Sequence, residues 1–374
     1  MSIYLDYNAT TPLRDEVKKE MLDIMGPPLN ASSVHSFGRQ AKTHLENART
    51  SISNFVNANS DQIIFTSGGT EANSMIMQIF KRPLISSIEH DAVIASSKNP
   101  NFIDVDSNGL VKIDDLEVKI KKFNPDIISV MWANNETGVI QPIKDIVKIA
   151  KKYKVYIHCD AVQALGKIDI DFKASGLNSL AISSHKIGGP VGVGALIVDD
   201  PYNLNPIILG GGQERGHRSG TENLIGIVGF ASAARKIFLD NTEINNIMSL
   251  QKKFEKLIKS KLPNIKIFGE NVPRLPNTTC VYMPHMNADA QVIAMDLKGF
   301  SVSAGSACSS GKVKSSHVLE AMGAKWASNK SIRISSGWQN TKNDLEKLLG
   351  FDILEKRIRV LERKNYWREK YKHG

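Results

Sequence analysis

The stretch Leu180-Ala181-Ile182-Ser183-Ser184-His185-Lys186 indicates the fold class. It starts as a short apolar run, turns polar, and is followed by Gly188-Gly189-Pro190. That order is typical of a buried strand whose carboxyl end delivers a lysine to a loop. A lysine there is a candidate Schiff-base nucleophile, but a single lysine is more often a solvated surface residue. Its role therefore depends on what else lies near the ends of neighbouring strands.

Similar apolar, β-branched runs occur on both sides of this stretch, separated by amphipathic segments. The segment from Ile143 to Tyr153, for example, places Ile146, Val147, Ile149 and Ala150 on one helical face. Alternation of this kind predicts an α/β fold with a mostly parallel sheet covered by helices on both sides, with ligands beyond the strands' carboxyl ends. The predicted strands are Ile63–Phe65, Leu84–Ser86, Ile127–Met131, Val155–His158, Leu180–Ile182 and Ala195–Val198.

The pattern changes after about Ser232. A long basic amphipathic stretch, roughly Thr242 to Lys261, precedes two further strand-like runs, Thr278–Tyr282 and Ser331–Ser335. This predicts a smaller α+β C-terminal domain. We place the large domain at residues 14–245 and the small domain at 246–374, with an N-terminal segment, 1–13, associating with the small domain.

Composition narrows the class of protein. The chain has 374 residues, of which 41% are hydrophobic, enough for a large core. It has neither an apolar run of about 18 residues nor the regions of a signal peptide, so we expect a cytoplasmic protein without a membrane segment. Its net charge of +10 could attract RNA or an acidic protein, but no RNA-binding signature occurs, and a solvated helical face is the favoured explanation. Three cysteines without CxxC spacing favour neither disulfides nor a metal site.

Polar residues cluster directly after predicted strands. Ser67-Gly68-Gly69-Thr70 leads into a helix near Thr70, which suits a phosphate but also describes an ordinary capped helix. Asp160 ends another strand, where it could pair with a pyridinium nitrogen or cap the next helix. The glycine-rich loop from Gly210 to Thr221 suits anions and subunit contacts equally.

Cys308 differs from the other two cysteines. It lies in Ser303-Ala304-Gly305-Ser306-Ala307-Cys308-Ser309-Ser310-Gly311, among small residues that suit a pliable loop, whereas Cys159 and Cys280 lie in apolar strand contexts. The context favours a functional thiol over a structural one.

Together these residues mark a family. The chain resembles the cysteine desulfurases of the NifS/IscS type, within the class-V aminotransferase family and the aspartate-aminotransferase-like (fold-type I) pyridoxal-phosphate (PLP) enzymes. Its Cys308 context is similar to the long-loop group. The matching blocks are 4–12, 30–35, 67–73, 89–90, 134–138, the pair Asp160 and Gln163, 183–186, 218–223, 305–311 and 331–335.

The resemblance implies a role for each matching residue. Lys186 would hold PLP as a Schiff base and Cys308 would accept sulfur. The substrate carboxylate would be held by Asn135 and Arg333. The remaining cofactor contacts would be His90 stacking on the ring, Asp160 at the ring nitrogen, Gln163 at the phenolic oxygen, and Gly69, Thr70, Ser183, His185 and Thr221 around the phosphate, with Thr221 coming from a second subunit.

The implied reaction removes sulfur from L-cysteine, gives L-alanine, and leaves a persulfide on Cys308 for a sulfur acceptor such as an iron–sulfur cluster assembly scaffold. The resemblance thus implies a homodimer without a resident metal, and the composition argues against a nucleic-acid partner. At one position the chain departs from the family, since Val191 stands where a lysine is usual. Alternatives are an aminotransferase or selenocysteine lyase on the same fold, and a catalytically idle binding protein with a relic pocket.

Overall fold

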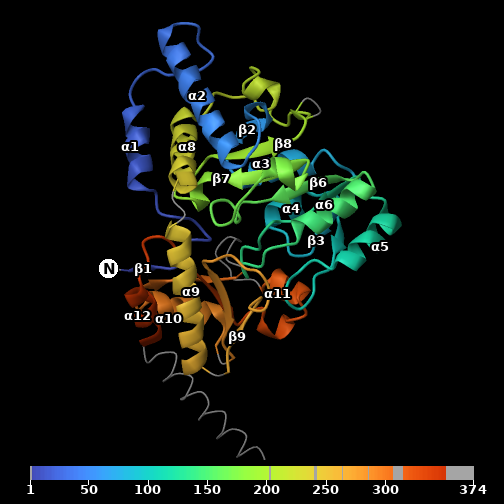
Figure 1. Cartoon of the computed structure of the whole chain (residues 1–374), viewed down its shortest axis with the longest axis vertical. Helices are drawn as coiled ribbons and strands as arrows, with labels where there is room; N and C mark the ends of the chain where they lie inside the picture. Colours follow the sequence, from blue (N-terminus) through green and yellow to red (C-terminus); the bar gives the residue numbers. More distant parts are fainter. Residues whose placement is uncertain are drawn as a thin grey trace, which may run out of the picture. The chain divides into compact units, whose positions relative to one another are not determined.

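A seven-stranded sheet organises the larger of the two units that the structure comprises (Figure 1). The computed structural model describes residues 2–201, 204–239, 242–262, 264–284, 286–305 and 315–350. The larger unit comprises Asn8–Asn135 and Val139–Asn241, and the smaller unit comprises Met1–Tyr7, Glu136–Gly138 and Thr242–Gly374. The domain boundaries drawn from the sequence, after residues 13 and 245, stay predictions.

The sheet of the larger unit has the strand order β2-β8-β7-β6-β5-β3-β4. Strand β8 runs antiparallel to both of its neighbours, and all other pairs are parallel. The prediction of a mostly parallel α/β sheet is thus confirmed. The strands are β2 (Ile63–Thr66), β3 (Pro83–Ser86), β4 (Asn101–Ile103), β5 (Ile127–Ser129), β6 (Tyr156–Asp160), β7 (Ser179–Ser183) and β8 (Gly194–Val198).

The strands are short and buried because almost every residue in them is apolar or small, as expected of a sheet covered on both faces. The predicted strand at 127–131 ends two residues earlier, at Ser129. Helix α6 (Ile143–Lys152) buries Ile146, Val147 and Ala150 as its spacing predicts, while Ile149 stays half-buried.

The helices of the larger unit lie between and around these strands (Figure 1), and α1 and α2 both pack against α8. Besides α6 they are α1 (Asp15–Asp23), α2 (Ser36–Phe55), α3 (Gly69–Met77), α4 (Asp91–Ser96), α5 (Ile113–Phe123), α7 (Phe172–Ser175) and α8 (Leu224–Leu239), with 3-10 turns η1 (Ser60–Gln62), η2 (Ser184–Lys186) and η4 (Glu214–Gly216).

The smaller unit is built on a four-stranded antiparallel sheet, ordered β12-β13-β10-β9, and a parallel pair formed by β1 and β11. The N-terminal strand therefore belongs to this unit. Its elements are β1 (Ile3–Tyr4), α9 (Thr242–Lys261), β9 (Lys266–Ile267), β10 (Thr278–Tyr282), α10 (Ala288–Asp296), β11 (Phe300–Ser301), β12 (Ser303–Ala304), α11 (His317–Ala321), η5 (Lys325–Ala327), β13 (Ser331–Ser335) and α12 (Lys342–Gly350).

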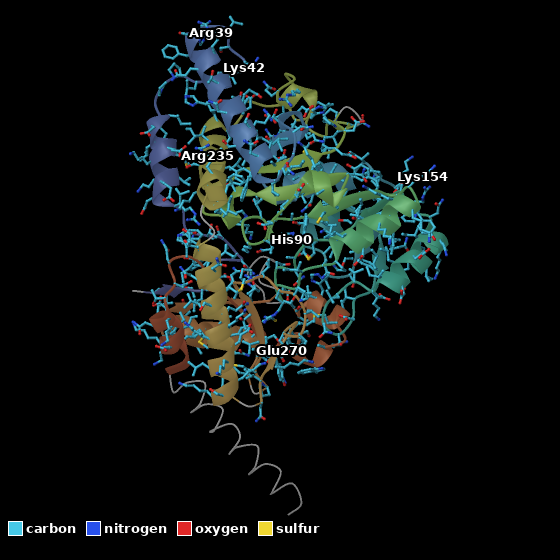
Figure 2. The ribbon with its side chains drawn as sticks, viewed as in Figure 1. Arg39, Lys42, His90, Lys154, Arg235 and Glu270 are labelled. Atoms are coloured by element: carbon cyan, nitrogen blue, oxygen red, sulfur yellow. The ribbon has the colours of Figure 1, made fainter. Side chains whose placement is uncertain are left out.

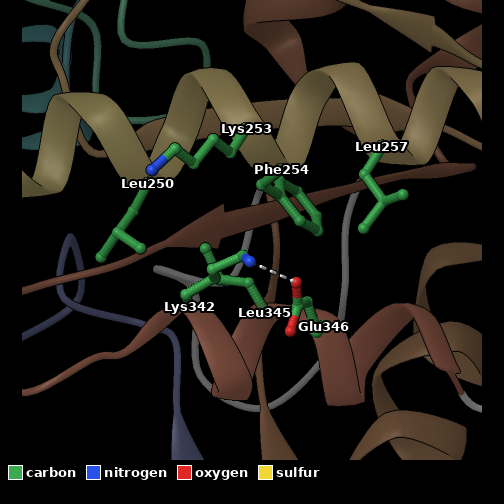
Figure 3. Close-up of a pocket in the computed structure, with 7 residues that line it drawn as sticks. All are labelled: Leu250, Lys253, Phe254, Leu257, Lys342, Leu345 and Glu346. Atoms are coloured by element: carbon green, nitrogen blue, oxygen red, sulfur yellow. Dashed lines mark ion pairs between the residues drawn. The ribbon is translucent and has the colours of Figure 1, made fainter.

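Helix α12 packs on α9 around a small apolar pocket (Figure 3). Leu250, Phe254 and Leu257 line it from α9, and the Lys342–Glu346 ion pair, 3.2 Å long, lies on α12. Lys253 of α9 and Leu345 of α12 complete the lining. Within the described residues, no helix combines the length and the apolar character needed to cross a membrane.

Candidate active site

The carboxyl ends of β2 and β7 lie on either side of the start of β8. Here the sheet edge means this side of the sheet, at which the parallel strands end. Gly194, which begins β8, pairs with Thr66 at the end of β2 and with Ser183 at the end of β7. A Cβ on Gly194 would lie 2.7 Å from the Ile182 carbonyl oxygen, so the close approach of these strands requires glycine. Polar groups that are distant in sequence are thereby gathered at one sheet edge.

Helix α3 begins at the same edge. A Cβ on Gly69 would lie 2.6 Å from Val162 Cγ2 and 3.7 Å from Ser183 Cβ, so the helix start adjoins the segment after β6 and the end of β7. Thr70, the second residue of the helix, is exposed. Unpaired N–H groups and the helix dipole at such an end attract anions, as the sequence predicted for this turn.

Glu71 and Arg218 form an ion pair at the start of this helix. Arg218 Nε donates to Glu71 Oε1 at 2.8 Å, and the Ser67 N–H donates to Glu71 Oε2 at 2.7 Å. Burial acts to raise the pKa of Glu71, but the hydrogen bonds from Arg218 and Ser67 outweigh it and leave the pKa lowered. The carboxylate is therefore ionised, and Arg218 balances its charge beside the anion-attracting end of α3.

His185 is held in a neutral state at this edge. Burial and the charges of Lys186 and Lys167 lower the pKa of His185 to about 4. Its Nδ1 lies 3.3 Å from Thr10 Oγ1, and its backbone oxygen accepts hydrogen bonds from Thr11 N and Oγ1 at 2.9 and 2.8 Å. A neutral imidazole is suited to donate one hydrogen bond to an anion.

Lys186 follows directly, in the turn η2 after β7. Its Nζ donates to the backbone oxygens of Asn8 and Ala9, at 2.5 and 2.7 Å. The side chain is half-buried, not solvated on the surface. Its surroundings therefore favour the functional interpretation over the surface one.

Gln163 lies beside the same N-terminal segment. Its Nε2 donates to Asn8 O at 2.9 Å, and its Oε1 accepts from Lys167 Nζ at 2.8 Å. Lys167 Nζ also donates to Asn8 Oδ1 at 3.1 Å. Because Oε1 of Gln163 already accepts from Lys167, its Nε2 points the other way. One N–H of Nε2 donates to Asn8, and the second N–H can donate to a ligand atom. Sequence reasoning missed Lys167, because a basic residue in the turn after Gln163 carries no distinctive pattern.

Asp160 ends β6 as a buried carboxylate whose partners are neutral. Asn73 Nδ2 donates to Oδ2 at 2.7 Å, and the Val162 N–H donates to Oδ1 at 2.9 Å. Among the described residues, no lysine or arginine forms an ion pair with it. A buried carboxylate of this kind is stabilised by a cationic ligand atom.

His90 is the N-cap residue of α4 (Figure 2). Its Nδ1 accepts the Ala92 N–H at 3.0 Å, which fixes the orientation of the ring. Neighbouring Glu89 is fully buried, and burial together with the charge of Asp160 raises its pKa well above the ordinary value. This environment favours the protonated form of Glu89.

Comparison with known proteins matches this architecture to one family. The model of the class-V aminotransferase family matches residues 3–348. The cysteine desulfurase IscS of Dictyoglomus turgidum is 38% identical, over 99% of this chain and 98% of its own. The chain belongs to the class-V aminotransferases, and within them to the cysteine desulfurases of the NifS/IscS type. A putative cysteine desulfurase of Bacillus subtilis is 35% identical over 92% of this chain and 96% of its own. The crystal structure of a NifS-like protein from Rickettsia africae has a TM-score of 0.88 at 40% identity, covering 95% of this chain and all of that one.

Class-V aminotransferases depend on PLP, and the residues present fit that cofactor. Buried Asp160 could accept the ring nitrogen, the start of α3 with Ser183 and neutral His185 could accept a phosphate, and half-buried Lys186 could provide the amine. Within the described residues, no group of three histidine, cysteine or acidic side chains is placed to hold a metal ion.

The predicted carboxylate-binding residues of a class-V enzyme lie in different units. Asn135 ends the first segment of the larger unit and its backbone oxygen accepts from Asn8 Nδ2 at 3.2 Å. Arg333 is a buried residue of β13 in the smaller unit. Each is described within its own unit, and their joint action on one substrate stays a prediction.

The remaining predicted residues concern a second subunit and the sulfur acceptor. Thr221 is exposed just before α8, and its role towards a second subunit stays a prediction. Val191, where the family usually has lysine, is 71% exposed. Cys308 and Gly311 lie outside the described residues.

Proposed function

We propose that this chain is a PLP-dependent cysteine desulfurase that converts L-cysteine to L-alanine and leaves a persulfide on Cys308. The observation that carries the proposal is that buried Asp160 ends β6 while neutral His185 and Lys186 directly follow the paired strand β7, whose last residue Ser183 adjoins the start of α3. A chain that also contains Cys308 among small residues has the two nucleophiles that this reaction needs.

The cofactor, when bound, supplies an electron sink for the bond-breaking at the substrate. Lys186 would hold the cofactor covalently, and its free amine would move the proton at the substrate Cα. Asp160 would pair with the ring nitrogen, Gln163 would donate from its NH₂ group to the phenolic oxygen, and His90 would cover the ring. Gly69, Thr70, Ser183 and His185 hold the phosphate.

Substrate orientation rests on Arg333 and Asn135, which bind the carboxylate of L-cysteine. A guanidinium matches a carboxylate with two parallel hydrogen bonds and so fixes the direction of the Cα–H bond. This arrangement selects an amino acid with a free carboxylate.

Cys308 completes the reaction as a thiolate, because the thiol is a poor nucleophile. Its sulfur attacks the sulfur of the substrate, an S–S bond forms, and the Cβ–S bond breaks. The electron pair stays on the carbon fragment, which takes up protons and leaves as L-alanine. One L-cysteine and one Cys308 thiol thus give one L-alanine and one persulfide.

The persulfide passes to an acceptor protein of iron–sulfur cluster assembly or another sulfur carrier, and the enzyme acts as a homodimer in the cytoplasm. The free, buried thiols Cys159 and Cys280 support a reducing compartment. Aminotransferase and selenocysteine lyase activities are the alternatives that the following experiment distinguishes.

The test is a single turnover with L-cysteine followed by mass mapping of sulfur on the chain. We expect one L-alanine and one extra sulfur atom on Cys308 in the wild type. Cys308→Ala should lose the sulfur while keeping the absorbance band of the bound cofactor, whereas the control Cys280→Ala should behave as the wild type. A normal cofactor band with no sulfur on Cys308, and amino-group transfer instead, would overturn the proposal.

The role of Thr221 in a second subunit is tested by mixing two variants of reduced activity. If Thr221 serves the cofactor of the other subunit, a mixed dimer of Lys186→Ala and Thr221→Ala chains has one intact site, formed by Lys186 of one chain and Thr221 of the other. Co-refolding should therefore restore part of the activity. Absence of any restoration in a mixture that sedimentation shows to be dimeric would contradict the role of Thr221.

A further inference from the structure

Four buried side chains form a continuous hydrogen-bonded row behind the sheet edge. Ser179 Oγ lies 2.8 Å from His158 Nδ1, and His158 Nε2 lies 2.9 Å from Asn73 Oδ1. Asn73 Nδ2 then lies 2.7 Å from Asp160 Oδ2. Their exposed fractions are 0% for Ser179 and His158, 1% for Asn73 and 5% for Asp160. The family resemblance assigned a role only to the last of the four.

The direction of every hydrogen bond in this row follows from the carboxylate at its end. A carboxylate accepts only, so Asn73 must turn its NH₂ group towards Asp160 and its oxygen towards His158. Nε2 of His158 must then carry the proton, and Nδ1 must accept from the hydroxyl of Ser179. Burial lowers the pKa of His158 to about 3, so the ring holds one proton, as this arrangement requires.

The row holds Asp160 from one side while the backbone holds it from the other. Asn73 occupies Oδ2 and the Val162 N–H occupies Oδ1, at 2.9 Å. With one donor on each oxygen, the carboxylate is fixed about its Cβ–Cγ bond. We infer that Ser179, His158 and Asn73 are positioning residues, which orient the Asp160 carboxylate towards the ring nitrogen of the cofactor. This inference rests on the pairing of Asp160 with that nitrogen in the proposed function.

Packing alone does not account for the row. Strands β6 and β7 already pair through their backbones, with His158 opposite Ser179. Buried polar side chains are unfavourable unless hydrogen-bonded, and apolar residues would fill these positions at lower cost. The row also ends at Asp160, which closes β6, and not at the neighbouring buried acid Glu89, whose Oε1 accepts from the Met131 N–H.

A matched control lies in the next strand. Ser129 of β5 is the residue opposite His158 on the other side of β6, and it is also fully buried. Its hydroxyl has no hydrogen-bond partner among the described residues. Ser129→Ala and Ser179→Ala therefore remove the same atom from the same sheet, but only Ser179→Ala removes a member of the row.

The first measurement uses ¹⁵N-edited NMR of the cofactor-free chain, with His158→Gln to assign the signals. We expect His158 to be the Nε2–H tautomer in the wild type and in Ser129→Ala. In Ser179→Ala the Nδ1 signal should shift because its donor is gone. An Nδ1–H tautomer in the wild type would overturn the inference.

The second measurement follows PLP binding and the pH dependence of the absorbance of the bound cofactor. We expect Ser179→Ala to weaken PLP binding by about three- to tenfold and to move the pH of the spectral transition, with Ser129→Ala matching the wild type. Equal behaviour of the two serine variants would show that the row is only structural. The wild-type desulfurase assay is separate, so its failure would count against the proposed function and leave the NMR result standing.

Discussion

Arg333 donates a hydrogen bond from Nη2 to Asp6 Oδ1 at 2.7 Å, and the two side chains form an ion pair within the smaller unit. The side chain of Arg333 is 3% exposed and that of Asp6 is 19% exposed. A carboxylate of the chain thus holds the guanidinium that we assign to the substrate carboxylate, and sets the direction of its remaining N–H groups.

Replacing Asp6 should therefore impair substrate binding more than cofactor binding. We expect Asp6→Asn to lower kcat/KM for L-cysteine about tenfold, mainly through KM, and to lower the free energy of unfolding by about 1–3 kcal/mol. The control is Glu255→Gln, which breaks the comparable 2.8 Å ion pair with Arg274 in the same unit. It should lose similar stability but keep KM, and an equal rise of KM in both variants would contradict the assignment of Arg333.

Gly305 is required by its contact with Glu136. A Cβ there would lie 2.3 Å from Glu136 Oε2, and that oxygen already accepts from Ser316 Oγ at 2.5 Å. The Glu136 carboxylate cannot move away without losing its hydrogen bond from Ser316. Gly305→Ala should thus cost about 1–3 kcal/mol by overpacking, measured by urea unfolding.

A double-mutant cycle tests the cause. Glu136→Asp shortens the side chain, so the loss in Gly305→Ala/Glu136→Asp should be smaller than the sum of the two single losses. Additive losses would mean that Glu136 is not what excludes a side chain at position 305.

Thiol reactivity should separate Cys308 from the other cysteines. Burial raises the pKa of Cys159, as does the charge of Asp160, and burial also raises the pKa of Cys280. Both are 0% exposed, so neither offers a thiolate at neutral pH. Iodoacetamide should label one cysteine in the native chain, Cys308, and all three in denaturant. Native labelling of Cys280, read by peptide mass mapping, would contradict the described burial.

The sequence could reveal Lys186, Asp160 and the start of α3, because each follows an apolar strand in a local pattern. The sheet then brings those strand ends together, as the register of Gly194 with Thr66 and Ser183 demonstrates. Partners distant in sequence leave no such pattern. Asn73 and His158, or Arg49 and Glu214, are ordinary residues until the fold places them in contact, and Lys167 looked like any basic residue after a turn.

Arg49 and Glu214 should be the more important of two neighbouring ion pairs. Arg49 donates to both oxygens of Glu214, at 2.8 and 2.9 Å, and the Phe65 N–H donates to Glu214 at 2.7 Å. Both side chains are at most 3% exposed, so removing one leaves a buried charge. We expect Arg49→Met to cost about 3–5 kcal/mol in urea unfolding. Arg215→Met removes a pair with Glu46 that is 42% exposed on both sides, and should cost less than about 1 kcal/mol.

The buried His158 should make the chain sensitive to acid. Its pKa is about 3 in the folded chain because of burial, against about 6.5 when unfolded. Between these values the unfolded chain binds a proton that the folded chain excludes, so the free energy of unfolding falls as pH drops from 6.5 towards 3, by about 1.4 kcal/mol per pH unit. His185, with a pKa lowered to about 4, acts in the same direction over a narrower range. In the cofactor-free chain, His158→Asn should therefore reduce the slope of stability against pH near pH 5 by about one proton, whatever its effect on absolute stability. An unchanged slope would mean that His158 is already protonated in the folded chain, so that Nδ1 donates to Ser179 instead of accepting from it, which would contradict the inferred order of the row.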